Sequence, residues 1–367
     1  MRTRALMAVA LALLAAACAG YAPAPMVEGD IRILDRLGGG AMHLAWSPDG
    51  RYLAADRGSG GFAVWDAQSG RKVRELRQDS WGRLGGQSDL AFTPDSKHVI
   101  VKASFSPTLY RDGRRIEFGV WNVESGTIAA TLVGPIGRPE KVGANAHAMG
   151  AEHLAVHYVT TEGALPTISV HEEVVLYDTR TWQQAHVFPV ARGTSGLAFD
   201  PSGRLLAASV GDSVSIYEAA SGRLVTTLAR VTVGTVHHFA YLAGDRVAAT
   251  ANWMWTPTTD LRGVRVLDAA GGASLQSFAR GSEVAYSLSR SADGRFLALA
   301  GGSVYAYSFK LWDTEAAREV GWLHGEGVAF HASALSPDGR RAAVSYGRTR
   351  RDTSEILVIA VGADAAK

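Results

Sequence analysis

A short phrase recurs along the 367-residue chain, and it limits the possible folds more than any other feature of the sequence. It has an apolar stretch, then Ser, Thr or Asp before Pro, then Asp or Ser before Gly or Ser, and a second apolar stretch. Four copies begin at Leu44, Leu90, Leu197 and Ser333, and a fifth, from Arg290, has Ala292 in place of proline. Two degenerate copies begin at Ala148 and Tyr241. Intervals of roughly 40 to 60 residues predict an array of similar units that bury a core only together.

Each phrase predicts a β-hairpin, because Pro fixes φ, Asp offers a local acceptor and Gly permits the positive φ of a tight turn. A third apolar run follows and ends in a large apolar residue and a polar one: Trp65-Asp66, Trp121-Asn122, Tyr177-Asp178, Tyr217-Glu218, Leu267-Asp268 and Trp312-Asp313. Turns such as Ser69-Gly70 and Ser221-Gly222 lead to a fourth run. The pattern therefore predicts four antiparallel strands per unit.

The chain resembles the WD-repeat β-propeller family, whose Trp-Asp dipeptide stands at Trp65-Asp66 and Trp312-Asp313 and is varied in the other units. The resemblance covers residues 31 to 361 and implies an all-β, seven-bladed β-propeller of four-stranded antiparallel blades. An α/β fold would need capped amphipathic helices, which the pattern lacks. The unbroken repeat disfavours two unrelated β domains, and an eighth blade is disfavoured because no eighth phrase is found.

Closure of the ring is predicted from two complementary deficits. The seventh unit has strands near Arg341 to Ser345 and Glu355 to Val361 but no fourth strand. Residues Ile31 to Leu37 form an orphan strand before the first unit. Pairing strand 31–37 into the last blade would remove an open edge, so we expect the N-terminal strand to close the ring.

The N-terminal residues predict a lipoprotein leader. Residues 1–17 begin with Arg2 and Arg4, continue through an apolar run and end in small residues, as secretory signal peptides do. The segment from Leu14 to Cys18 resembles the bacterial lipobox, which implies cleavage before a lipidated Cys18. Residues 18–30 are then a lipidated tether and residues 362–367 a tail. The alternative is an ordinary signal peptide, with Cys18 discarded or left as a free thiol.

The same segment bears on location and on charge. Residue 19 is Ala and not Asp, the inner-membrane retention signal of enteric bacteria, so the resemblance points to the periplasmic side of the outer membrane. Without Arg2 and Arg4 the formal charge of +2 becomes zero, which disfavours nucleic acid as a partner. A single cysteine excludes an intramolecular disulfide and a cysteine-based zinc site.

No catalytic motif is found in a supporting context: there is no phosphate-binding glycine loop, zinc-protease helix or nucleophile elbow. Residues 65–71 resemble the closing motif of quinoprotein dehydrogenase blades, but the following strands end in Leu76, Leu132 and Leu228 where that family has Trp. We therefore expect no enzyme activity and no cofactor. His43, Asp89 and His238 share one place before their first strands, which line the channel. They predict a polar rim of a wet channel in preference to a metal site.

Insert lengths indicate a binding face. The second, third and fifth units have long inserts between their second and third strands, which emerge on one face of a propeller, here called the insert-bearing face. The hairpin and Ser-Gly turns emerge on the opposite face, the turn face. The insert-bearing face is rich in aromatic residues and arginines, which are enriched at interface hot spots. The candidates are Tyr110, Arg114, Arg115, Tyr158, Trp253, Trp255, Tyr305, Tyr307, Tyr346, Arg350 and Arg351. The alternative is that the inserts only extend the hairpins.

Together these features predict a non-catalytic envelope lipoprotein whose propeller is a rigid protein-interaction platform. Its expected partners are the membrane, through the N-terminal lipid, and an unknown protein or envelope component, with no nucleic acid. A periplasmic enzyme or a carbohydrate-binding propeller that uses the same face is the alternative.

Overall fold

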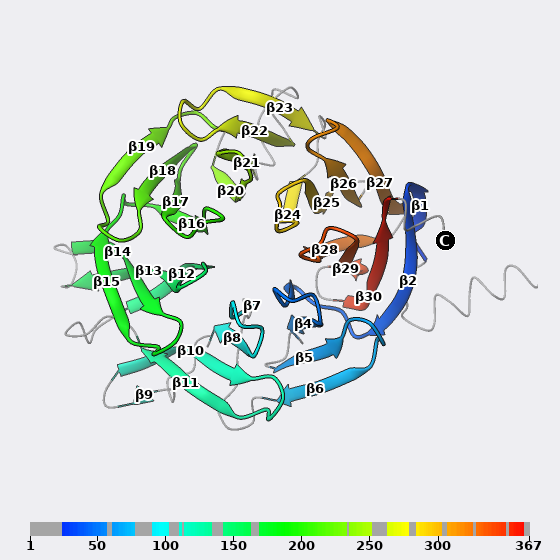
Figure 1. Cartoon of the computed structure of the whole chain (residues 1–367), viewed down its shortest axis with the longest axis horizontal. Helices are drawn as coiled ribbons and strands as arrows, with labels where there is room; N and C mark the ends of the chain where they lie inside the picture. Colours follow the sequence, from blue (N-terminus) through cyan, green and yellow to red (C-terminus); the bar gives the residue numbers. More distant parts are fainter. Residues whose placement is uncertain are drawn as a thin grey trace, which may run out of the picture.

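The computed structural model describes residues 24–56, 61–77, 90–102, 110–111, 114–133, 142–162, 169–232, 235–251, 263–278, 284–302, 307–325, 328–349 and 352–362. These residues form a ring of seven antiparallel sheets, with the first strand of each blade innermost (Figure 1). The ring confirms the predicted seven-bladed β-propeller. The expected signal peptide, Cys18 and residues 363–367 of the expected tail lie outside the described residues.

The first four blades follow the chain from the inner strand to the rim. Blade one has β3 (Leu44–Trp46), β4 (Tyr52–Asp56), β5 (Gly61–Asp66) and β6 (Lys72–Arg77). Blade two has β7 (Leu90–Phe92), β8 (His98–Lys102), β10 (Arg114–Asn122) and β11 (Ile128–Val133), with β9 (Tyr110–Arg111) paired to β10. Blade three has β12 (Val142–Met149), β13 (His153–Glu162), β14 (Ser169–Asp178) and β15 (Gln184–Pro189). Blade four has β16 (Thr194–Phe199), β17 (Leu205–Val210), β18 (Ser213–Glu218) and β19 (Leu224–Leu228).

The last three blades include the N-terminal strands. Blade five has β20 (Val236–Leu242), β21 (Arg246–Ala251), β22 (Val264–Asp268) and β23 (Ser274–Phe278). Blade six has β24 (Val284–Arg290), β25 (Phe296–Gly302), β26 (Tyr307–Asp313) and β27 (Arg318–Gly325), with β1 (Met26–Gly29) as a fifth strand. Blade seven has β28 (Ala329–Leu335), β29 (Arg341–Thr349), β30 (Asp352–Val361) and β2 (Ile31–Gly38).

The first turn of a blade is held by a serine and an aspartate two residues apart. In blade seven the Ser336 hydroxyl donates to Asp338 at 2.6 Å and accepts from the Arg341 N–H at 2.9 Å, while Asp338 accepts from the Arg340 N–H at 3.1 Å. Blades one, two and six repeat these bonds with Ser47, Thr93 and Ser291. The phrase recognised in the sequence is therefore a closed hydrogen-bond network.

Blade four keeps this network with its two polar residues exchanged. Asp200 takes the place of the serine and accepts from the Leu205 N–H at 2.6 Å, while the Ser202 hydroxyl donates to Asp200. The Arg204 N–H then donates to Ser202 at 3.3 Å. The contact between a carboxylate and a hydroxyl thus occurs in either order, whereas residues 150–152 of blade three and 243–245 of blade five turn without any Ser or Thr.

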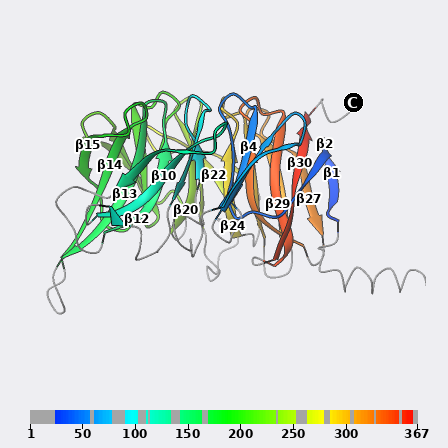
Figure 2. The same ribbon diagram turned by 90° about the horizontal axis from the view of Figure 1, so that it is seen from below.

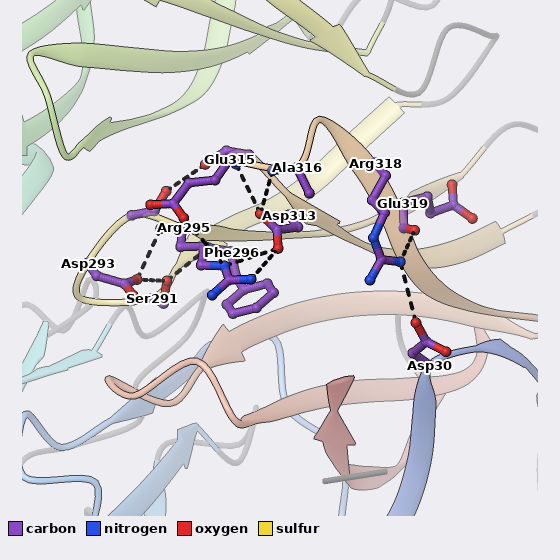
Figure 3. Close-up of polar contacts among 12 residues, drawn as sticks. Asp30, Ser291, Asp293, Arg295, Phe296, Asp313, Glu315, Ala316, Arg318 and Glu319 are labelled. Atoms are coloured by element: carbon purple, nitrogen blue, oxygen red, sulfur yellow. Dashed lines mark hydrogen bonds and ion pairs between the residues drawn. The ribbon is translucent and has the colours of Figure 1, made fainter. Parts of the chain in front are cut away.

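The acid that ends the third strand caps the second turn of a blade. Asp313 accepts from the N–H groups of Glu315 and Ala316 at 3.0 and 2.9 Å, and Asp66 accepts from the Ser69 N–H at 2.9 Å. Figure 3 shows that Asp313 also receives Arg295 from the first turn of blade six, with Nε at 3.0 Å and Nη2 at 2.8 Å. The Trp-Asp acid thus joins the two turns of blade six.

The fourth strand of every blade carries a one-residue bulge opposite the end of the third strand. The extra residues are Val73, Ala129, Ala185, Val225, Leu275, Val320 and Leu34, all of them aliphatic. Val73, Val225, Leu275 and Leu34 are 37 to 51% exposed, whereas Val320 is 3% exposed. The bulge residue of blade six is therefore buried, whereas the bulge residues of these other blades are exposed to solvent.

The core lies between blades and not within them. Seven buried apolar clusters each combine residues from two neighbouring blades. The cluster between blades seven and one, for example, packs Leu37, Ile356 and Val358 against Trp46 and Trp65. Each sheet buries both faces against its neighbours, so the stability of each blade depends on the blades beside it.

Strand β2 closes the ring, as the sequence predicts. Its partner is β30, with Ile31 opposite Val361 and Leu37 opposite Ile356. Figure 1 shows the N-terminal strand β2 beside the C-terminal strand β30. The Asp30 carbonyl also accepts from the Gly362 N–H at 2.9 Å, which joins the two ends of the folded domain.

Strand β1 is a feature that the sequence analysis missed. It lies within the segment expected to be a tether and pairs with β27, with Met26 opposite His324 and Gly29 opposite Gly321. The Asp30 N–H donates to the Val320 carbonyl at 2.7 Å, and Figure 3 shows Arg318 reaching Asp30. This strand covers the bulge of blade six, so residues 26–29 belong to the propeller.

Leu37→Ala tests the closure. Leu37 is 5% exposed in the cluster between blades seven and one, and removing a buried Leu side chain typically costs about 2 to 5 kcal/mol. Leu34→Ala is a matched control, because Leu34 lies in the same strand but is 42% exposed at the bulge. We expect the control to cost less than about 1 kcal/mol by chemical denaturation. Equal losses would contradict a closing role for β2.

Candidate functional site

The two faces of the ring differ in what they expose. Antiparallel strands in sequential order place the first and second turns of each blade on the turn face, and they place the second-to-third connections and the interblade connections on the insert-bearing face. Figure 2 views the ring from the side, so that the two faces lie above and below the strands. A recess lined by side chains of blades seven and one lies on the turn face.

The recess lies at the seam between blades seven and one. In the other six blades a covalent turn joins the third and fourth strands, but in blade seven these strands are β30 and β2, from opposite ends of the chain. At the turn face these strands are joined by the hydrogen bond between Gly362 and Asp30 beside the pair of Ile31 and Val361, with no covalent turn. The seam therefore lacks one of the loops found beside the other interblade contacts.

A groove with a volume of about 830 Å³ occupies this place, and we call it the seam groove. Its wall from blade one includes Trp46, Asp49, Arg51, Asp66 and Gln68, and its wall from blade seven includes Leu34, Pro337, Asp338, Arg340, Arg341 and Ala360. A smaller cavity of about 280 Å³ continues it along β2 and shares Leu34, Trp46, Asp66, Gln68 and Arg341. Together they form one continuous recess with apolar and charged walls.

Two hydrogen bonds across the seam fix the shape of the groove. The Trp46 indole Nε1 donates to the Ala334 carbonyl at 3.1 Å, and the Arg341 Nη1 donates to the Ala67 carbonyl at 2.6 Å. Trp46 is 8% exposed and therefore shows only part of its ring to the groove. A partner would meet a preformed surface, which lowers the entropy cost of binding.

The acids of the groove are engaged within their own turns. Asp49 and Asp338 hold the first turns of blades one and seven, and Asp66 holds the second turn of blade one. Hydrogen bonds from the hydroxyl and N–H of Ser69 lower the pKa of Asp66. Burial would raise the pKa of Asp338, but hydrogen bonds from the Ser336 hydroxyl and the Arg340 N–H outweigh it and lower the pKa. Asp66 and Asp338 are therefore ionised acceptors at neutral pH.

The arginines of the groove are placed differently from Arg295 of blade six. Arg295 and Arg340 both follow the glycine of the first turn, but the position of Asp313 is taken by Ala360 in blade seven. Arg51 has the same place in blade one, where its guanidinium lies 4.8 Å from the ring centre of Tyr52 and its side chain is 60% exposed. The groove is thus lined by Arg340, by Arg341, which donates to Ala67, and by Arg51, which lies 4.0 Å from Glu124 of blade two.

Two of the predicted binding residues are core residues. Tyr158 is fully buried, and its hydroxyl lies 3.0 Å from the hydroxyl of Tyr177. Tyr346 is 2% exposed, and its hydroxyl donates to Glu355 at 2.7 Å and accepts from Arg36 at 3.0 Å. Burial and the bond to Glu355 raise the pKa of Tyr346 to about 12. Neither ring is available to a partner, which corrects the sequence-based assignment.

The remaining candidates of the insert-bearing face are not placed as side chains. The backbone of Tyr110, Arg114 and Arg115 lies in the β9–β10 hairpin, and that of Tyr307 in β26. Trp253, Trp255, Tyr305, Arg350 and Arg351 lie outside the described residues. The predicted binding surface on this face therefore stays a prediction.

The inserts of blades two and three do extend hairpins. In blade two, Arg114 pairs with Arg111 and Arg115 with Tyr110. In blade three, β13 and β14 pair over their whole length to Glu162 and Ser169. The extra chain in blade three is thus largely additional strand, as the alternative reading of the inserts expects.

The predicted channel residues do not form a metal site among the described residues. His43 precedes β3, and its Nδ1 lies 3.6 Å from the buried carboxylate of Asp56, while His238 lies in β20 of blade five. Asp89 lies outside the described residues. Within the described part of the chain no group of three or more His, Cys, Asp or Glu side chains could hold a metal ion.

A buried histidine–glutamate pair was missed by the sequence analysis. His157 in β13 is fully buried, and its Nε2 lies 3.1 Å from Glu172 of β14. The Glu172 carboxylate also accepts from the N–H groups of Gly193 and Thr194, at 2.9 and 3.2 Å. The pair therefore ties blade three to the connection that leads into blade four. Only the strand register brings the two residues together, so no local motif announces them.

Comparisons with known proteins leave the family open. No protein-family model matches the chain, and no curated protein matches it. Within the described ranges no helix has the length and apolar character needed to cross a bilayer.

The His157–Glu172 pair predicts a pH dependence of stability. Burial lowers the pKa of His157 below its ordinary 6.5, against the opposing effect of Glu172, and its Nδ1 has no hydrogen-bond partner among the described residues. The unfolded chain therefore takes up a proton below pH 6.5 that the folded chain does not. We expect the free energy of unfolding to fall between about pH 7.5 and pH 5.5, by at most about 1.4 kcal/mol per pH unit from this group.

His157→Gln isolates this contribution, because the amide keeps a donor for Glu172 but does not titrate. Chemical denaturation across this pH range should give a smaller loss of stability for His157→Gln than for the unchanged protein. The carboxylates with lowered pKa values change the free energy of unfolding only below about pH 4.5, so they do not contribute to its pH dependence in this range. An identical pH dependence of the two proteins would contradict the assignment.

Proposed function

We propose that this protein is a non-catalytic bacterial envelope lipoprotein whose WD-type propeller serves as a rigid protein-interaction platform. The leader and the lone Cys18 support lipid attachment at the periplasmic side of the outer membrane. The seven-bladed ring supports the platform, because a closed array of shared cores holds its surface loops in fixed positions.

The seam groove is the main observation that supports a role as an interaction platform. Its walls combine Trp46 and Leu34 with Arg51, Arg340 and Arg341, and tryptophan and arginine are residue types that dominate interface hot spots. The groove is open to solvent between two blades, which suits side chains of a protein segment more than an enclosed small molecule.

The groove holds three arginines and three aspartates, and the hydrogen-bond donors of the arginines favour an acidic partner segment. Asp49, Asp66 and Asp338 accept hydrogen bonds from their own turns, whereas arginine donates through a planar fork that matches carboxylate geometry. We therefore propose that the partner presents Asp or Glu side chains beside an apolar residue. The insert-bearing face is the second candidate surface, favoured by its long inserts, with Trp253 and Trp255 as its proposed anchors.

Cys18→Ser tests the anchor. The variant should lose its acyl groups and move from the membrane to the soluble envelope fraction, or stay unprocessed, because one thiol carries the proposed lipid. Ala19→Ser is the control and should keep membrane attachment. Membrane flotation and mass spectrometry of the N-terminal peptide measure both. An acyl-free mature N-terminus in the unchanged protein refutes lipidation.

Arg51→Glu/Arg340→Glu tests the seam groove by affinity capture from the cell envelope. Reversing two charges against an acidic partner should reduce captured partner by roughly tenfold or more. Arg204→Glu is the matched control, because Arg204 has the same turn position in blade four, away from the seam. Thermal unfolding first confirms that the variants fold. If the groove variant keeps its partners while Trp253→Ala/Trp255→Ala loses them, the partner binds the insert-bearing face.

A further inference from the structure

We infer that the lipid anchor holds the insert-bearing face toward the membrane surface and leaves the turn face, with the seam groove, directed into the aqueous compartment. This inference rests on the proposed lipidation of Cys18. It follows from the side of the ring at which the chain enters β1 and from the number of residues between that point and Cys18.

The chain enters the ring at the insert-bearing face. β27 runs from the second turn of blade six on the turn face, at Arg318, to Gly325 at the opposite face. β1 is antiparallel to β27, and its first residue, Met26, lies opposite His324. Figures 1 and 2 place β1 on the outer wall of the ring beside β27. The polypeptide before Met26 therefore leaves the ring at the rim of the insert-bearing face.

Side chains fix this entry point. Glu28 accepts from the Trp322 indole at 2.8 Å and lies 2.9 Å from Nε2 of His324. The hydrogen bond with His324, followed by that from Trp322, lowers the pKa of Glu28. Pro25 is buried, and its Cα lies near Gly325. The start of β1 is thus attached to the end of β27.

The tether is too short to place the other face against a membrane without full extension. Cys18 and Met26 are eight residues apart, which gives at most about 29 Å for an extended chain and roughly 16 Å for a flexible one. The eight residues of β27 span the ring over about 26 Å. At random-coil dimensions, eight residues therefore reach a membrane beside the insert-bearing face and fall short of one beside the turn face.

This orientation separates the two candidate surfaces by their surroundings. Residues of the insert-bearing face meet lipid head groups, whereas the seam groove opens toward soluble partners. We thus infer that the insert-bearing face lies against the membrane surface, because the tether is short.

Cysteine labelling of the lipidated protein in native membranes tests the orientation. Gly38→Cys and Thr235→Cys are exposed at the insert-bearing face, in blade seven and before blade five; Ala316→Cys and Ala220→Cys are exposed at the turn face of blades six and four. A Cβ at Gly38 meets no atom within 4 Å, so that substitution is accommodated. Lipidated Cys18 has no free thiol, so each variant carries one reactive group.

The readout is the rate of reaction with a bulky polyethylene-glycol maleimide, in membranes and after detergent extraction. We expect the two insert-face positions to react several-fold more slowly in membranes than in detergent, and the two turn-face positions to react equally in both. A Gly/Ser insertion of about 20 residues after Gly20 raises the flexible reach from roughly 16 Å to roughly 29 Å and should abolish the protection.

The outcomes separate the inference from the function on which it rests. A protein that fails to float with membranes contradicts the lipid anchor itself. Flotation with equal reaction at both faces, or with protection of the turn face, overturns the orientation. Protection that survives the Gly/Ser insertion also overturns it, because a cause other than tether length would then hold the face.

Discussion

The pairing of β2 with β30 is the contact on which the whole ring depends. Every apolar cluster is shared by two neighbouring blades, so a ring that stays open leaves two blades with an unburied face. β2 supplies the fourth strand of blade seven and places Leu37 against blade one. One noncovalent strand pair therefore completes the two clusters that blade seven shares with blades six and one. It also creates the seam groove, because a strand from the other end of the chain replaces the loop found in the other blades.

The sequence predicts those elements whose chemistry is local. The hairpins of five blades could be predicted because a carboxylate and a hydroxyl close the first turn within six residues, even in blade four, where the two are exchanged. Closure of the ring could be predicted because the last unit lacks a fourth strand and the N-terminal segment has an extra one. Strand β1 could not be predicted, because Met26 to Gly29 are all exposed and show no alternation of buried and exposed side chains. Tyr158 and Tyr346 were misplaced because aromatic content near an insert does not tell which strand face a side chain occupies.

The candidate site needed the assembled ring. Ala360 is unremarkable in the sequence and becomes informative only when the strand register aligns it with Asp313 and its counterparts. The groove walls come from residues nearly 300 positions apart, as the bond from Trp46 to Ala334 shows. His157 and Glu172 likewise meet only through the pairing of β13 and β14. Sequence reasoning finds contacts within a turn and misses those made across blades.

The antiparallel path of β1 and β2 has a mechanical consequence. Hydrogen bonds between β1 and β27 run across the strands, so tension applied before Met26 and directed along β1 loads all of these bonds in shear at once. The chain then reverses at Gly29 and Asp30 before it enters β2. Tension transmitted through the N-terminus is therefore borne by blade six, and the pairing that closes the ring carries load only after β1 has detached.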